Sequence, residues 1–161
     1  GQRHISLSTC GICDRIYELA DRDFPITLSI SLHAVTDEKR SRIMPINRRY
    51  NIETLMSACR YYIKKTNRRI SFEYTLISGV NDTTDEAKAL LSLISGMLCH
   101  VNLIPVNKVS GTGFSPTVAR SVERFRQTLE NGGVSATVRR EMGADISAAC
   151  GQLRAAAEGI Q

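Results

Sequence analysis

The chain has 161 residues, of which 42% are hydrophobic and 23% are charged. A chain of this length and composition buries one ordinary core, which excludes an intrinsically disordered segment. No apolar run approaches the roughly 20 residues that span a bilayer, so no membrane partner is expected. Because the cysteines are odd in number and no stretch resembles a secretory signal, we expect reduced thiols and a cytoplasmic protein.

Charge is unevenly distributed along the chain. The net charge is +5, and ten basic residues lie between Lys39 and Arg69, where Glu53 is the only acid. Such a segment can neutralise the phosphates of a nucleic acid and gain free energy from counterion release. A solvated helix face followed by a loop is the other interpretation, and charge alone does not decide between the two.

Strand-like and helix-like patterns alternate along the chain. Alternating apolar and polar residues predict strands at 3–8, 26–32, 69–77, 101–105 and 134–139. Helical spacing of apolar residues predicts helices at 12–22, after an Asn51 N-cap, after a cap within 82–85, with Pro116 in the first turn, and at 146–157. The stretches 34–50 and 108–116 are expected to be long loops that carry substrate or lid elements.

This alternation predicts an α/β fold with parallel strands joined by right-handed crossovers. Two architectures stay open, a doubly wound sheet and part of a β/α barrel, and both place their chemistry at the carboxyl ends of the strands. The polar residues expected at those ends are Ser8, Thr9, Ser31, His33, Glu73, Asn107, Arg139, Arg140 and Glu141. The strand at 3–8 is expected to leave an exposed edge through which copies of the chain associate.

Cysteines offer two places where chemistry is conceivable. Cys10 and Cys13 form C-G-I-C, but a zinc site needs about four ligands and no second pair has suitable spacing. Two small residues at a strand-to-helix turn are therefore favoured over a metal or redox pair. Cys59 lies on the apolar stripe of its helix and is expected in the core. Cys150 lies among small residues with Gly151 directly after it, and both a structural and a reactive thiol stay open there.

Four polar side chains stand at the ends of predicted strands, namely Ser8, Ser31, His33 and Asn107. In either architecture these ends lie at the same edge of the sheet. Together they would suit a polar small molecule, such as a nucleoside with an amino-acid tail. A purely structural role for His33 is the alternative.

A series of short motifs follows in a fixed order along the chain. The motifs are R-H-I-S-L-S-T-C-G-I, S-L-H-A, R-S-R-I-M-P-I-N-R-R-Y, F-E-Y, G-V-N-D, V-N-L-I-P-V-N, V-R-R-E-M-G-x-D-I and A-A-C-G-Q-L. Each is weak alone, but the ordered set resembles the RlmN/Cfr family of radical S-adenosylmethionine (SAM) RNA methyltransferases, and RlmN more than Cfr. The resemblance covers residues 3–154.

The resemblance implies both a fold and a function. The fold is a partial (β/α) barrel of the radical SAM type with about five mostly parallel strands. Residues 1–161 would be the C-terminal part of that barrel domain. Members of the family methylate C2 or C8 of an adenosine in 23S ribosomal RNA, and RlmN members also act on certain transfer RNAs. We therefore expect a C2 methyltransferase as the parent protein, with a Cfr-like C8 methyltransferase as the alternative.

The resemblance also assigns residues and cofactors. Cys150 matches the cysteine that carries the methyl group as S-methylcysteine. The positions that contact SAM match Ser8, Ser31, Leu32, His33 and Asn107. The resemblance also implies that the basic segment between Lys39 and Arg69 binds RNA. Contacts are expected at Arg48, Arg49, Lys64, Lys65 and Arg68. The family further uses a [4Fe-4S] cluster and an electron donor such as flavodoxin.

The departures from the family pattern concern the cluster. The C-x-x-x-C-x-x-C that ligates it is absent from the chain, as are the following glycine-rich segment and the second catalytic cysteine. We therefore expect no metal ligand here, and the cluster-binding half of the barrel and the N-terminal accessory domain to be missing. The chain alone is expected to be inactive. The alternatives are a non-catalytic RNA-binding or assembly module derived from the same barrel, and an α/β enzyme with a cysteine nucleophile.

Overall fold

The computed structural model describes residues 5–106 and 115–139. In them, one sheet of five strands forms, and every neighbouring pair of strands is parallel. The strands are β1 (Ser6–Thr9), β2 (Thr27–Ser31), β3 (Ile70–Leu76), β4 (Cys99–Pro105) and β5 (Ala136–Val138). The expected α/β fold with five parallel strands is confirmed. Within the same residues, no helix combines the length and the apolar character needed to cross a membrane.

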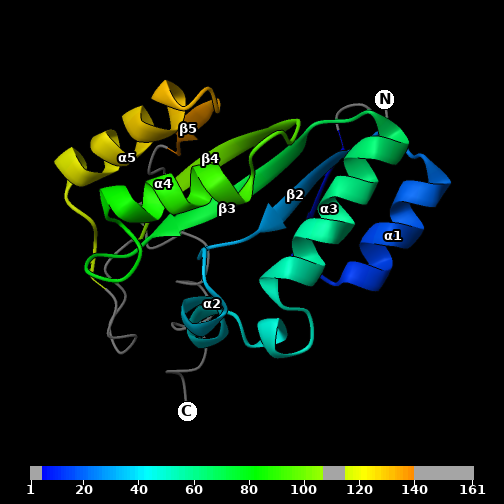
Figure 1. Cartoon of the computed structure of the whole chain (residues 1–161), viewed down its shortest axis with the longest axis horizontal. Coiled ribbons are helices and arrows are strands. Elements are labelled where there is room, and N and C mark those ends of the chain that lie inside the picture. Colours follow the sequence, from blue (N-terminus) through cyan, green and yellow to red (C-terminus); the bar gives the residue numbers. More distant parts are fainter. Residues whose placement is uncertain (1–4, 107–114, 140–161) are drawn as a thin grey trace, which may run out of the picture.

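The order of the strands decides between the two architectures. Across the sheet the order is β1-β2-β3-β4-β5, which is also their order in the chain. Every crossover therefore steps in one direction, whereas a doubly wound sheet reverses direction at a switch point. Right-handed crossovers that all step one way place their helices on one face, as in a β/α barrel. The sheet in Figure 1 is accordingly a barrel segment.

Burial along the strands alternates as a barrel segment requires. In β3, Ile70, Phe72, Tyr74 and Leu76 are fully buried, whereas the residues between them are only partly covered. Successive side chains of a strand point to opposite faces of its sheet. One face of the sheet therefore packs into the core, and the described residues leave the other face open.

Helices cover the buried face and begin where the sequence predicts, except that Pro116 lies before the last of them and not in its first turn. The four helices over this face are α1 (Cys13–Arg22), α3 (Ile52–Thr66), α4 (Thr84–Leu93) and α5 (Ala119–Asn131). The Asn51 side chain accepts a hydrogen bond from the Thr54 N–H, and the Thr83 hydroxyl accepts one from the Glu86 N–H, so both expected caps are present. In Figure 1, α1 and α3 lie side by side near β2, and α4 and α5 lie near β3 and β4.

Two further expectations from the sequence are wrong. Residues 34–50 are not a plain loop, because they contain the helix α2 (Asp37–Ile43) and the 3₁₀ helix η2 (Pro45–Arg48). The charged composition of α2 hides its helical pattern, although Thr36 caps it. Glu73 does not end a strand, since β3 continues beyond it to Leu76. The helix expected at 146–157 and residues 108–114 of the second loop lie outside the described residues.

Candidate functional site

The open face of the sheet is lined almost entirely with polar side chains. The parallel register places Ser29 beside Ser8, Glu73 beside Ser31, and Asn102 beside Glu73. The side chains that share this face are Ser6, Ser8, Thr27, Ser29, Ser31, Ser71, Glu73, Thr75, His100, Asn102, Ile104 and Thr137. Only Ile104 in this set is apolar. Such a face is suited to a polar ligand rather than to packing against a second apolar layer.

Hydrogen bonds join several of these side chains across neighbouring strands. The Glu73 carboxylate accepts from the Asn102 amide at 2.8 Å and from the Ser71 hydroxyl at 3.3 Å. On β4, the His100 ring contacts the Thr137 hydroxyl at 2.9 Å. Burial, with a smaller effect of Arg69, lowers the pKa of His100. The middle of the open face is therefore a connected polar network with a neutral histidine near pH 7.

Two of the residues expected to contact a ligand lie at the carboxyl ends of β1 and β2. Ser8 is exposed and Ser31 is half-buried, and both side chains are on the open face. Leu32 differs, because its side chain is fully buried in the core on the opposite face. Its backbone is also engaged, because its N–H donates to the Glu73 carbonyl and its carbonyl accepts from the Ala34 N–H and from Arg40.

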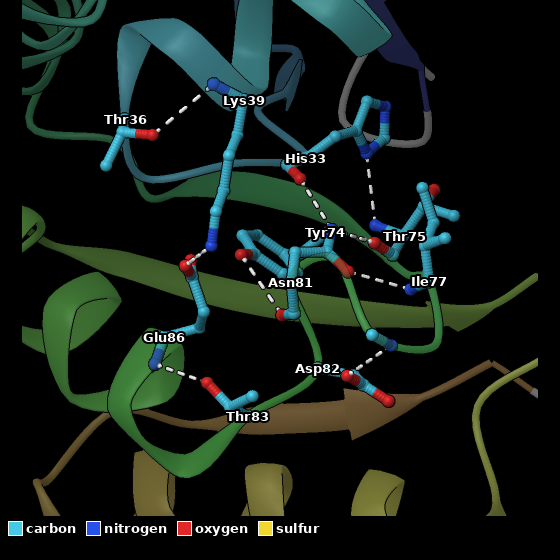
Figure 2. A network of polar contacts seen from close by, with 11 residues as sticks. His33, Thr36, Lys39, Tyr74, Thr75, Ile77, Asn81, Asp82, Thr83 and Glu86 are labelled. Carbon is cyan, nitrogen blue, oxygen red and sulfur yellow. Dashed lines mark hydrogen bonds and ion pairs between the residues drawn. The ribbon is translucent and has the colours of Figure 1, made fainter. Parts of the chain in front are cut away.

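His33 directly follows Leu32 and has a left-handed backbone with a φ of 59°. Its Nδ1 accepts a hydrogen bond from the backbone N–H of Thr75 at 3.1 Å, as Figure 2 shows. Burial, with a smaller contribution from the charge of Arg40, lowers the pKa of His33 to about 4. The ring is therefore neutral near pH 7. Since Nδ1 is the acceptor, the ring proton is on Nε2.

Asn81 holds the same turn from the loop after β3. Its side chain is fully buried, and its amide nitrogen donates to the carbonyls of His33 and Thr75, each at 2.7 Å. Its amide oxygen accepts from the Ile77 N–H at 2.7 Å. These contacts lie beside the His33 ring in Figure 2. The motif G-V-N-D contains Asn81, but a polar residue in a turn carries no sequence signal of burial.

Arg40 is fully buried, although in the sequence it is one of the ten basic residues of the charged segment. Its guanidinium donates at 2.9–3.1 Å to the carbonyls of Cys10, Ser31 and Leu32 and to Oδ1 of Asn47. Cys10 follows β1 and Leu32 follows β2, so one side chain ties the carboxyl ends of two strands to α2. Arg40 is therefore not available to phosphates, and nothing in its sequence context indicates this role.

An ion pair fixes α2 against α4. Nζ of Lys39 contacts the carboxylate of Glu86, which is nearly buried at the start of α4 (Figure 2). The segment between β2 and α3 is thereby held from two sides, by Arg40 at the strand ends and by Lys39 at α4. This places α2 over the carboxyl ends of the strands as a fixed element of the site.

The cysteines in the described residues do not form a metal site. Burial raises the pKa of the Cys13 thiol to about 11 and that of the Cys59 thiol to about 12. Metal binding requires thiolates, which these environments disfavour. No three His, Cys, Asp or Glu side chains of the described residues come together to hold a metal ion. Cys10 and Cys13 lie at a strand-to-helix turn and Cys59 lies in the core, as the sequence predicts.

The expected RNA contacts fall into two groups at opposite ends of the sheet. Arg48 and Arg49 precede α3 on the side of the strands' carboxyl ends. α3 then runs back against the strand direction, so Lys64, Lys65 and Arg68 lie near the amino end of β3. Its 15 residues span roughly 22 Å. Only the first group is therefore close to Ser31 and His33.

Acidic residues of α1 neutralise part of this charge. The ion pairs between the two segments, each with a separation of 3.7 Å, are Asp14–Arg49, Asp21–Lys65 and Asp23–Arg68. Most of these side chains are well exposed, so the pairs add little stability. They lower the local positive charge of a segment that looks almost free of acids in the sequence, because α1 packs against α3.

Several expected residues lie outside the described part of the chain. Cys150 and Asn107 are among them, as are Arg140 and Glu141. The structure thus brings Ser8, Ser31 and His33 together at one end of the open face. It adds Arg40 and Asn81, which fix the backbone there.

Comparisons with known proteins find close relatives but no matching family model. Over 154 residues, or 96% of the chain, the sequence is 60% identical to the Clostridium perfringens protein named "Probable dual-specificity RNA methyltransferase RlmN". It is 57% identical over the same share of the chain to a protein of that name from Clostridioides difficile. The chain spans 44% and 45% of these two relatives, which is less than half of their length.

Solved structures give the same result for the fold. A radical SAM methyltransferase from Sphaerobacter thermophilus superposes with a TM-score of 0.91 at 48% identity, over 94% of this chain and 45% of its own. A domain of pyruvate-formate lyase-activating enzyme from Bacteroides vulgatus superposes with a TM-score of 0.66 at 16% identity, which shows a shared fold alone. These matches confirm the resemblance to RlmN-type radical SAM methyltransferases.

Proposed function

Because the chain resembles RlmN-type radical SAM methyltransferases over nearly its whole length, we propose that it is part of the catalytic barrel of an RNA methyltransferase. The parent enzyme methylates C2 of an adenosine in 23S ribosomal RNA and also acts on transfer RNA. One observation carries the proposal: the sequence match extends over 96% of the chain. The polar open face that ends in Ser8, Ser31 and His33 supports it.

SAM fits the chemistry of this end of the sheet. It presents a carboxylate, an ammonium group, ribose hydroxyls and a purine, so its site needs both donors and acceptors. The Ser8 and Ser31 hydroxyls can do both, and His33 donates through Nε2. The side chain of Asn107 adds a further donor and acceptor to the proposed set, and Leu32 completes it through van der Waals contact of its backbone. When bound, SAM supplies a methyl group, and these residues would orient it.

A [4Fe-4S] cluster does not fit the described residues. Such a cluster is held by thiolates that converge on one point, whereas burial keeps Cys13 and Cys59 protonated. We therefore place its ligands elsewhere in the parent protein, together with the contact to an electron donor such as flavodoxin. The chain by itself is expected to leave RNA unmethylated.

Cys150 is the residue that we propose to carry the methyl group as S-methylcysteine. In the sequence, its neighbours are small and Gly151 follows it, a pattern that suits a cysteine that must accommodate a methyl group and move. A cysteine must reach the thiolate form to accept a methyl group as a nucleophile. Cys59 provides a matched comparison, because its thiol is fully buried among apolar side chains.

The proposal is tested on the full-length gene product that contains this chain, reconstituted anaerobically with iron and sulfide. Labelled methyl transfer from SAM to a 23S ribosomal RNA transcript is measured, and the modified base is identified by mass spectrometry. C2-methyladenosine is expected, with transfer lost in Cys150→Ala and kept in Cys59→Ala. Transfer that survives Cys150→Ala contradicts the role of Cys150, and C8-methyladenosine contradicts the assigned position. RNA binding without any transfer would identify a non-catalytic module instead.

A further inference from the structure

The pairing of β2 with β3 ends with a change of hydrogen-bond partners. The register, continued by one residue, would pair Leu32 with Tyr74. A parallel ladder would then send the Leu32 N–H to the Glu73 carbonyl and the Thr75 N–H to the Leu32 carbonyl. The first bond is present at 3.0 Å. In place of the second, the Thr75 N–H donates to Nδ1 of His33 at 3.1 Å.

Two fully buried side chains bind the backbone carbonyls at this point. In place of the missing ladder bond, the Leu32 carbonyl accepts hydrogen bonds from the Ala34 N–H at 2.8 Å and from Nε of Arg40 at 3.1 Å. The Asn81 amide donates to the next carbonyl, that of His33, at 2.7 Å. Two consecutive peptide groups are thus each held by a side chain from a different element, α2 on one side and the loop after β3 on the other.

The conformation held in this way is one that His33 would not adopt by preference. A φ of 59° is left-handed, and the Cβ of a histidine makes that region unfavourable. The Asn81 bond to the His33 carbonyl and the Thr75 bond to its ring oppose relaxation of the turn. The ring therefore replaces a backbone acceptor in the sheet, and its position depends on these buried partners.

We infer that Arg40 and Asn81 are positioning residues that end β2 after Ser31 and fix His33 as a hydrogen-bond donor through Nε2. They act through the backbone and the ring of His33 and do not themselves touch the ligand. Because the Thr75 N–H occupies Nδ1, the neutral ring is confined to the tautomer with the proton on Nε2. The ligand atom that meets Nε2 is consequently an acceptor, such as a purine nitrogen or an oxygen, and not an ammonium group or a metal ion. This inference rests on the proposed function insofar as SAM is that ligand.

The unsubstituted chain provides a direct test. With ¹⁵N-labelled histidine and backbone, NMR spectra report the tautomer of each of the three histidines, and substitution of His4 and His100 assigns the signals. We expect the Nε2–H tautomer for His33 and a scalar coupling across the hydrogen bond between the Thr75 nitrogen and Nδ1. A His33 ring with its proton on Nδ1 would overturn the inference.

Variants test the two positioning residues. Asn81→Asp keeps an acceptor for the Ile77 N–H but removes both amide donors. It should abolish the coupling, mix the two tautomers and speed hydrogen exchange of the Thr75 amide by at least about tenfold. Arg40→Lys keeps the positive charge but loses the several guanidinium donors. It should likewise weaken the coupling, mix the tautomers and speed hydrogen exchange of the Thr75 amide. Val122→Ala, in α5, is the control for reduced packing and should leave the His33 signals unchanged.

Each outcome bears on the inference. A folded Asn81→Asp chain that keeps the tautomer and the coupling shows that the inference is wrong. If Asn81→Asp does not fold, Arg40→Lys and the coupling in the unsubstituted chain decide the question. Titration with SAM separates this inference from the proposed function: an unmoved Nε2 signal contradicts SAM contact at His33, whereas the tautomer and the coupling still decide how His33 is positioned.

Discussion

Arg40 and His33 show how single residues shape the end of the sheet. Burial lowers the pKa of Arg40, yet its guanidinium keeps its charge because three carbonyls and one amide oxygen accept hydrogen bonds from it. His33 takes the opposite course and stays neutral, because burial and the Arg40 charge both disfavour its protonated form. One fixed cation and one fixed neutral donor therefore stand side by side at the strand ends.

Replacing Arg40 by Met should destabilise the chain strongly. The change leaves the carbonyls of Cys10 and Ser31 and the amide oxygen of Asn47 without this donor, so we expect the free energy of unfolding to fall by about 3 kcal/mol. Urea denaturation followed by circular dichroism measures this. Arg42→Met is the matched control in the same helix, because Arg42 is exposed and pairs only with Glu38 there. Its expected loss is about 0.5 kcal/mol or less, and equal losses in the two variants would contradict the structural role of Arg40.

The lowered pKa of His33 predicts a pH dependence of stability. The unfolded chain binds a proton at His33 near the ordinary pKa of about 6.5, whereas the folded chain does so only at about 4. The contribution of His33 to stability should therefore be fully present above the unfolded value, and on the order of 3 kcal/mol should be lost as the pH drops from the unfolded to the folded value. His33→Asn tolerates the left-handed backbone and does not titrate. A variant with the same pH dependence as the unsubstituted chain would show that His33 does not cause the effect.

Packing between elements separates the basic residues of the charged segment into groups with different surroundings. The sequence places ten basic residues together, but α3 carries three of the five expected contacts to the far end of the sheet, and the segment of α1 supplies acids beside them. The segment is consequently not one basic patch. Its groups differ in distance from the site and in local charge.

An RNA-binding measurement on the full-length gene product should separate the two groups. Arg48→Glu combined with Arg49→Glu is expected to weaken RNA binding roughly tenfold, because these residues lie at the site end of the sheet. Lys64→Glu combined with Lys65→Glu makes the same change in charge at the other end and should have a smaller effect. Fluorescence anisotropy over a series of salt concentrations gives both affinities. Equal losses would mean that RNA does not distinguish the two ends.

The ion pair between α2 and α4 gives a second prediction for elements. Lys39→Met leaves the Glu86 carboxylate nearly buried and without its cation, and one of its oxygens already lacks a hydrogen-bond partner. The free energy of unfolding should fall by about 2 kcal/mol. Adding Glu86→Gln removes the unpaired charge and should recover part of the loss. A double-mutant cycle from urea denaturation measures the coupling, and a coupling energy near zero would contradict this account.

On the scale of the whole molecule, the sheet is a barrel segment with an exposed first strand. β1 pairs only with β2 in the described residues, and Ile5 and Leu7 are 52% and 44% exposed. A strand edge with apolar side chains is a template for pairing with another strand. In the parent protein, we propose that the remaining part of the barrel covers this edge.

The chain studied alone should therefore associate through β1. Leu7→Lys is expected to weaken self-association roughly tenfold, because a lysine at an edge disfavours pairing between copies. Val118→Lys is the control, since Val118 is 65% exposed and lies just before α5. Sedimentation velocity over a range of concentrations distinguishes the variants. A monomer at high concentration without any substitution would contradict the prediction.

The sequence by itself determined the features that depend on neighbouring residues. Alternating burial in the strands and the Asn51 and Thr83 caps all arise from contacts within a few residues, so their patterns are legible in the chain. The polar strand ends at Ser8 and Ser31 follow from the same local periodicity. The ordered motifs added the family and the roles expected of single residues.

Only the tertiary structure decided the features that join distant residues. The strand order selected a barrel segment over a doubly wound sheet. Arg40 reaches the Cys10 carbonyl 30 positions away, and Asn81 reaches the His33 carbonyl 48 positions away. No local pattern reports such contacts, because a buried polar group is set by where the chain folds its partners and not by its neighbours in sequence. The sequence shows His33 only as a polar residue at a strand end, whereas the structure identifies it as a neutral hydrogen-bond donor with a fixed tautomer.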